Sequence, residues 1–154
     1  MKRIMFVCHG NICRSPMAEL VFKKMIRERG LEDEFFVASS ATSTEEIWNG
    51  VGNPVYPPAK AELAKHGIST EGKRAVQLRA DDVDKYDMFI AMDSANIRNM
   101  HRMLGAKGAN KISKLLDYTD RGGDVADPWY TGNFDVTYKD VTEGCAALLE
   151  YLTR

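Results

Sequence analysis

A cysteine and an arginine six positions apart, Cys8 and Arg14, stand between a short apolar run and a segment of helical character. The apolar run ends at Val7, and Pro16 is typical of a first helical turn. A strand that passes through a tight loop into a helix directs successive backbone N–H groups, and the positive end of the helix dipole, toward one point. The sequence therefore predicts an anion-binding loop over residues 8–15.

The residue types in this loop suit attack on a phosphate. Arg14 offers a planar guanidinium that can hold two phosphate oxygens at once. The positive potential of the loop favours the thiolate form of Cys8, and a thiolate beside a bound phosphate is a nucleophile directed at phosphorus. Ser15 is a natural helix cap, and its hydroxyl could also donate to the sulfur. Treating Cys8 as an ordinary buried cysteine would leave Gly10 and Asn11 unexplained.

The composition limits the remaining possibilities. A chain of 154 residues can bury one core, so we expect a single domain over residues 1–154. A formal net charge of -1 does not favour nucleic acid or an anionic membrane as a partner. No run approaches the length of a membrane span, no metal-ligand spacing occurs, and three cysteines do not make a disulfide framework. We expect a cytoplasmic protein that needs neither metal nor cofactor.

Strand-like and helix-like segments alternate along the chain. This alternation predicts an α/β fold with a parallel sheet covered by helices on both faces, and a ligand site at the carboxyl ends of the strands. A long loop over residues 42–57 carries Trp48, and a second over residues 117–135 carries Asp127. The predicted strands are 3–8, 35–38, 88–92 and 112–115, and the predicted helices are 16–30, 58–67, 80–85, 94–104 and 136–152.

Residues 7–16, Val-Cys-His-Gly-Asn-Ile-Cys-Arg-Ser-Pro, resemble the signature of the low-molecular-weight protein tyrosine phosphatases. The segment Asp127-Pro128-Trp129-Tyr130 resembles a second motif of that family, and residues 39–42 and 86–96 match it in the same order. The resemblance implies a three-layer fold with a four-stranded sheet in the order 2-1-3-4. It also implies metal-independent hydrolysis of phosphotyrosine through a cysteinyl-phosphate, with phosphotyrosine proteins or peptides as substrates and inorganic phosphate as product.

The roles that the resemblance implies fall into two groups. Cys8 is the nucleophile, Arg14 holds the phosphate, Ser15 donates to the departing sulfur, and Asp127 is the general acid and then the general base. A proline after Asp127 restricts it to an extended conformation, from which its side chain can reach over the rim. The predicted phosphate- and substrate-binding residues are His9, Gly10, Asn11, Ile12, Cys13, Trp48, Trp129 and Tyr130.

The aromatic residues in the two polar loops allow two interpretations. Trp48, Trp129 and Tyr130 could each fill a small satellite core, or they could line a slot for a phenyl ring. By resemblance, Trp129 and Tyr130 form the walls of the slot, Ile12 its floor and Trp48 its edge. A slot of that depth favours phosphotyrosine over the shorter phosphoserine. Phosphoarginine-specific relatives carry Thr at the position of Ile12, so the bulky apolar residue favours an aryl phosphate.

One departure from the family and two rival functions remain at this point. The family often has a histidine in the network that supports Asn11, and Lys73 occupies that place here. A thioredoxin-coupled arsenate reductase shares the fold and the loop, but it needs two relay cysteines near residues 75–95, where this chain has none. A catalytically idle phosphoprotein-binding module would be expected to lose Cys8 or Asp127.

Cys13 could pack beneath the loop or capture an oxidised Cys8 as a disulfide.

Overall fold

The computed structural model describes every residue of the chain, 1–154. Its main sheet has four parallel strands in the order β2-β1-β5-β6, which is the predicted order 2-1-3-4. The α/β fold class predicted from the sequence is therefore confirmed. The strands are β1 (Lys2–Cys8), β2 (Phe35–Ala41), β5 (Met88–Ala91) and β6 (Ile112–Lys114).

Both faces of the central strand β1 are buried, as expected for a parallel strand between two layers of helices. Ile4 and Phe6 point into the larger of two hydrophobic clusters, and Met5 and Val7 point into the smaller. The period of two along a strand sends alternate side chains to opposite faces, so one short apolar run supplies both layers of the core. That run also fixes where the strand ends, with Cys8 at its carboxyl end.

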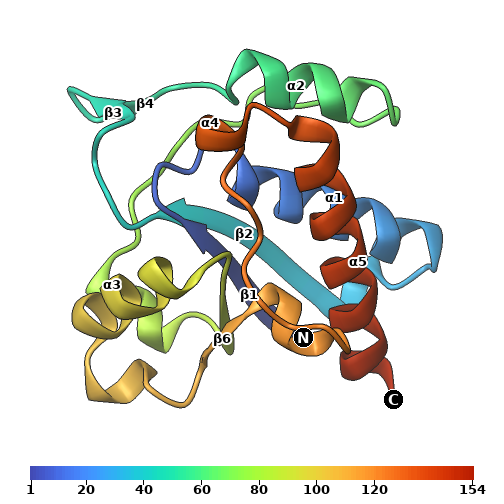
Figure 1. Cartoon of the computed structure of the whole chain (residues 1–154). Helices are drawn as coiled ribbons and strands as arrows, with labels where there is room; N and C mark the ends of the chain where they lie inside the picture. Colours follow the sequence, from blue (N-terminus) through green and yellow to red (C-terminus); the bar gives the residue numbers. More distant parts are fainter.

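Helices cover the two faces unequally. Helices α1 and α5 lie on one face with the larger cluster, and α3 lies on the other with the smaller (Figure 1). The helices are α1 (Arg14–Glu28), α2 (Pro57–Ala64), α3 (Ser94–Leu104), α4 (Pro128–Thr131) and α5 (Phe134–Thr153). Short 3-10 turns occupy Glu32–Glu34, Ala80–Asp84, Ala106–Gly108 and Leu115–Tyr118. No helix has both the length and the apolar character that crossing a bilayer requires.

The first helix begins earlier than predicted. It starts at Arg14 with Cys13 in the N-cap position, so the prediction of Ser15 as the cap is wrong. The Cys13 carbonyl accepts a hydrogen bond from the Met17 N–H at 3.1 Å, which places Ser15 inside the first turn. This shift matters for chemistry, because a Ser15 that does not cap the helix leaves its hydroxyl free to face the sulfur of Cys8.

The two long loops contain short regular elements that the sequence did not predict. The first carries a small antiparallel hairpin, β3 (Ile47–Trp48) and β4 (Val51–Gly52). The hairpin is fixed at its base because Gly52 lies against the backbone of Ala75, where an added Cβ would come within 1.8 Å of the Ala75 carbonyl oxygen. The second loop carries α4, directly after Asp127.

Candidate active site

The predicted anion-binding loop forms at the carboxyl end of β1. The backbone N–H groups of residues 10–13 donate to no other atom of the protein, so they are available to an anion. Asn11 adopts a left-handed conformation with φ of 59°, which Asn tolerates better than most residues and which bends the loop back toward Cys8. Free donors beside the start of α1, a helix of 15 residues, make a site with positive potential for phosphate.

The hydroxyl of Ser15 faces the Cys8 sulfur, and its neighbours fix the direction of the bond. The two atoms, Cys8 Sγ and Ser15 Oγ, lie 3.0 Å apart. Asn11 Nδ2 donates to the same hydroxyl at 2.7 Å, so Ser15 accepts there, and its own proton faces two acceptors, the sulfur at 3.0 Å and the more distant Ser40 carbonyl at 3.5 Å. The Ser15 backbone N–H also points at the sulfur, at 3.4 Å. Both contacts stabilise a thiolate more than a thiol.

Asn11 is itself held by a network that links the loop to β2 and α1. The Val76 N–H donates to Asn11 Oδ1 at 3.0 Å, which settles the orientation of the amide. Asn11 Nδ2 then donates to Ser39 Oγ at 2.9 Å, and Ser39 Oγ donates to Glu19 at 2.6 Å. The Asn11 amide therefore donates two hydrogen bonds. One goes to Ser15, which contacts the Cys8 sulfur, and the other goes to Ser39, which donates to the buried carboxylate of Glu19.

Lys73 terminates this network. Its Nζ lies 2.8 Å from Glu19, whose side chain is only 5% exposed, and Lys23 pairs with the other carboxylate oxygen at 2.6 Å. Burial raises the pKa of Glu19, but Lys73 and the hydrogen bonds from Lys23 and Ser39 outweigh it, so the pKa lies below its ordinary value. Lys73 thus helps to keep Glu19 ionised.

Lys73→Met is expected to lower the free energy of unfolding by about 2 kcal/mol at pH 7, because Glu19 stays buried with one cation fewer. A folded-state pKa below the unfolded value gives stability that is present above the unfolded pKa and is lost as pH falls through the folded pKa. The difference between wild type and variant should therefore shrink in acid. Urea unfolding at pH 7 and at acid pH measures it, and kcat should also fall, about tenfold, as Asn11 relaxes.

Lys65→Met is the matched control. Lys65 also pairs with a buried carboxylate, Glu62, but at 3.4 Å and with a side chain that is 67% exposed. Its removal should change stability by less than about 0.5 kcal/mol and leave kcat unaltered. Equal effects of the two substitutions on stability and on kcat would show that Lys73 does not act through the network.

Arg14 is fixed beneath the loop by carboxylates from two other segments. Its Nη1 donates to Asp93 at 2.8 Å and to the Val125 carbonyl at 3.0 Å, and Nη2 lies 3.5 Å from Asp127. Burial alone would lower the pKa of Arg14, but Cys8 and Asp93 more than reverse this, so its pKa lies above the ordinary value. Sequence reasoning missed Asp93 as a site residue.

Asp93 carries out two tasks at once. Its Oδ1 accepts from the Asn96 N–H at 2.8 Å, as the N-cap of α3, and its Oδ2 accepts from Arg14. The sequence signal was present, because an Asp directly after a buried strand lies at the ligand-binding edge of a parallel sheet. That signal is also what an ordinary helix cap gives.

Asp127 reaches the same edge from the loop before α4. Its backbone is extended, as a following proline requires, and its Oδ1 accepts from the Trp129 N–H at 3.0 Å. Its Oδ2 faces Arg14. The carboxyl group is thus held beside the guanidinium, and it is partly open to solvent.

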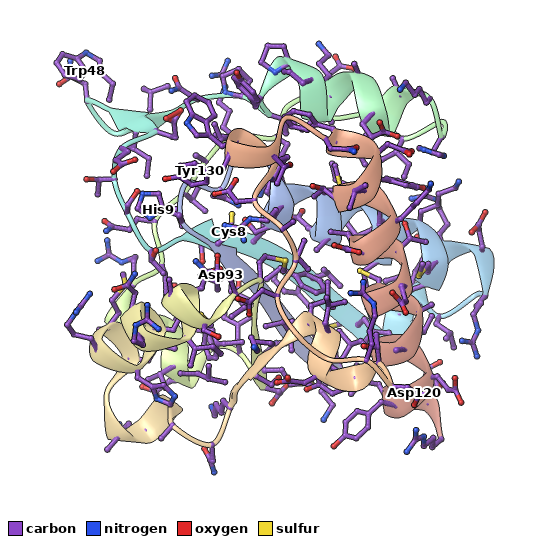
Figure 2. All side chains as sticks on the ribbon, in the orientation of Figure 1. Cys8, His9, Trp48, Asp93, Asp120 and Tyr130 are labelled. Carbon is purple, nitrogen blue, oxygen red and sulfur yellow. The ribbon has the colours of Figure 1, made fainter.

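A cavity of about 240 Å³ opens above the loop. Figure 2 shows Cys8, His9, Asp93 and Tyr130 gathered in the region where this cavity opens. Eleven of the twelve predicted site residues belong to the loop or line the cavity; the exception is Trp48. The lining residues are Cys8, His9, Gly10, Asn11, Ile12, Cys13, Arg14, Glu45, Glu46, Asp127, Trp129 and Tyr130.

The structure does not bring Trp48, predicted at the edge of the slot, to the cavity. Trp48 lies at the tip of the β3–β4 hairpin, 79% exposed and far from Cys8 (Figure 2). The base of the hairpin is fixed against Ala75, and the residues before the hairpin, Glu45 and Glu46, line the cavity. These two carboxylates are site residues that the sequence did not reveal.

The other two cysteines are buried thiols. Burial raises the pKa of Cys13 to about 12, with a further contribution from Cys8, so Cys13 is neutral beneath the loop. Cys145 lies in the core, where burial raises its pKa as well, and its sulfur faces the Ala18 carbonyl at 3.6 Å. The prediction that Cys145 belongs to the core is confirmed. No three His, Cys, Asp or Glu side chains meet in an arrangement that could hold a metal ion.

The parallel sheet and its cysteine–arginine loop define an α/β enzyme that handles phosphate at the carboxyl edge of its strands. The family model described as low molecular weight phosphotyrosine protein phosphatase matches residues 3–154. Because that match covers nearly the whole chain, the chain belongs to this family. The prediction made from the two sequence motifs is thereby confirmed.

Named relatives agree with this assignment. The chain is 40% identical over 148 residues to the low molecular weight protein-tyrosine-phosphatase YfkJ of Bacillus subtilis, covering 95% of this chain and 92% of that protein. It is 34% identical over 152 residues to the low molecular weight protein-tyrosine-phosphatase PtpA of Staphylococcus aureus, and the match covers 98% of this chain and 94% of that protein. The crystal structure of YfkJ matches with a TM-score of 0.92 at 38% identity over 99% of this chain and 94% of the other. The crystal structure of the phosphatase SP-PTP from Streptococcus pyogenes matches with a TM-score of 0.88 at 36% sequence identity, and the match covers 100% of this chain and 95% of the other.

Proposed function

We propose that this protein hydrolyses phosphotyrosine in proteins or peptides without a metal ion, through a cysteinyl-phosphate on Cys8. The observation that carries the proposal is the arrangement around one sulfur: free backbone donors, the Ser15 hydroxyl at 3.0 Å and a buried Arg14 guanidinium. Together these groups would bind the phosphate oxygens and place hydrogen-bond donors at the sulfur. They would stabilise the charge of a phosphoryl group in transfer.

In the first step the Cys8 thiolate attacks phosphorus, and the sulfur–phosphorus bond forms as the bond to the phenolic oxygen breaks. Asp127, in its acid form, gives its proton to that oxygen. The negative charge of a bound phosphate favours the acid form of a nearby carboxyl group, which is what this step needs.

In the second step water attacks the cysteinyl-phosphate. The Asp127 carboxylate takes a proton from the water, inorganic phosphate forms and the Cys8 thiolate leaves. The Ser15 hydroxyl stabilises the departing sulfur, which is the nearer acceptor for its proton while Asn11 donates to the same oxygen. We place the reaction in the cytoplasm, where reducing conditions keep Cys8 free of disulfides.

The walls of the cavity favour an aryl phosphate. Trp129 is held at the mouth by Tyr56, with ring centroids 5.0 Å apart, and Ile12 is buried at the base. The two rings are tilted by 50° relative to one another, and this contact holds the indole in place to meet a phenyl ring. The shorter side chain of phosphoserine would not carry phosphorus down to Cys8 while its peptide stays outside.

Activity is expected to persist in EDTA and to favour phosphotyrosine over phosphoserine peptides of the same sequence. Trp129→Ala should reduce that preference, because the ring contact contributes on the order of 1 kcal/mol. Phosphate release from paired peptides measures both effects. Cleavage of the phosphoserine peptides as fast as the phosphotyrosine peptides would show that the cavity does not select an aryl group.

A further inference from the structure

The mouth of the cavity carries negative charge that the catalytic chemistry does not use. Besides Asp127, the carboxylates that line the cavity are Glu45 and Glu46, and no lysine lines it. The one buried cation, Arg14, already faces Asp93 and Asp127. The protein as a whole has a formal net charge of only -1, so this negative rim is a local feature and not the result of an acidic surface.

The segment that carries the two glutamates is attached to the catalytic loop. The Thr42 N–H donates to the Cys8 carbonyl at 3.0 Å, and the Ser43 N–H donates to the His9 carbonyl at 3.0 Å. Glu46 is positioned further, since its carboxylate accepts from Asn53 Nδ2 at 3.2 Å. The segment that carries both carboxylates is therefore fixed to the catalytic loop at its start, and Glu46 is also held by its own side chain.

The neighbours of the two carboxylates leave room for a cation. Glu46 also rests against the loop, because a Cβ added to Gly10 would come within 3.3 Å of its Cγ. Glu45 faces His9 at 3.0 Å, but these side chains are 70% and 51% exposed. An ion pair that open to solvent contributes little to stability, so Glu45 can exchange it for a cation supplied by a substrate.

We infer that Glu45 and Glu46 determine substrate specificity by favouring a lysine or arginine next to the phosphotyrosine and disfavouring an acidic neighbour. The inference rests on the proposed function, and it names the class of peptide that the same cavity takes. A residue adjacent to a phosphotyrosine seated over Cys8 has to lie at the rim. There a cation meets two carboxylates, whereas a substrate carboxylate meets two like charges.

The test uses capped phosphotyrosine peptides that differ only in the two residues flanking the phosphotyrosine, which are both Lys, both Gln or both Glu. For wild type in about 20 mM salt, kcat/KM should be roughly tenfold higher for the Lys than for the Glu peptide, and the ratio should approach one in about 500 mM salt. In the double variant Glu45→Gln/Glu46→Gln the ratio at low salt should fall to about one. Each ratio is taken within one protein, so a general loss of activity cancels.

Glu150→Gln, an exposed glutamate on α5, is the control and should keep the wild-type ratio. If wild type does not hydrolyse even the Gln peptide, the proposed function fails. If it hydrolyses that peptide but shows a Lys-to-Glu ratio near one, the specificity inference is overturned. A high ratio that survives in the double variant also overturns it, because the discrimination then comes from charges elsewhere.

Discussion

Cys8→Ser is expected to reduce turnover to background, a loss of at least about 10⁴-fold, while the protein still binds inorganic phosphate. The serine hydroxyl is neutral at pH 7, and no side chain other than Ser15 makes a hydrogen bond to the atom it replaces. The free N–H groups of residues 10–13 and the Arg14 guanidinium are unchanged in the variant. Binding and chemistry should therefore separate. Steady-state rates with an aryl phosphate and calorimetric titration with phosphate measure the two effects.

Cys145→Ala provides the matched control for the loss of a thiol. Cys145 is fully buried in the core on α5, so its replacement should cost some stability and leave kcat unaltered. Alkylation offers an independent check, since iodoacetate should label Cys8 in the wild type and added phosphate should protect it. Substantial turnover by pure Cys8→Ser protein would show that another group attacks phosphorus.

The parts of the site that could be predicted from the sequence are those that a short stretch of chain determines. One buried strand, a loop of defined residue types and a helix start specify where Cys8 and Arg14 lie, because their relative positions depend on a few backbone angles. The order of strands and helices then places the loop at the carboxyl edge of a parallel sheet. Asp127 was found because it resembles a known motif and follows the last strand.

The parts that could not be predicted depend on contacts between distant segments. The sequence placed Lys73 beside the network that supports Asn11, but nothing local indicated that its partner would be Glu19 of α1. Trp48 was assigned to the edge of the cavity by resemblance to the family, since a large aromatic in a polar loop fits a small satellite core as well as a binding slot. Its true position depends on the hairpin, whose base is fixed by the packing of Gly52 against Ala75.

Asp93 shows a different limit, since one residue serves two structural purposes. As a helix cap it is fully explained by the pattern that follows it, with Asn96 three residues later. Its contact with Arg14 adds nothing to that pattern. Sequence reasoning that stops at the first sufficient explanation of a residue will miss the second, and residues at the ligand-binding edge of a sheet are where this matters most.

Asp127→Ala should lower the rate by about 10²–10⁴-fold for substrates with a poor leaving group, the usual range for a general acid. The loss in the first step should shrink as the leaving group becomes more acidic, because the departing oxygen then needs less protonation. Rates of cysteinyl-phosphate formation for a series of aryl phosphates measure this dependence. With the best leaving groups, slow hydrolysis of the intermediate should produce a burst of about one phenol per enzyme, since the same carboxylate also activates water.

Asp120→Ala is the control, because Asp120 lies in the same loop, is exposed and stands far from Cys8 (Figure 2). Removing it should leave the rates within about twofold of wild type for every leaving group. Asp127 also faces Arg14 at 3.5 Å, so its loss could act through the guanidinium instead of through proton transfer. A displaced guanidinium would slow all substrates alike and weaken phosphate binding. An equal loss across the series would therefore assign Asp127 to positioning Arg14, and a loss graded with the leaving group assigns it to proton transfer.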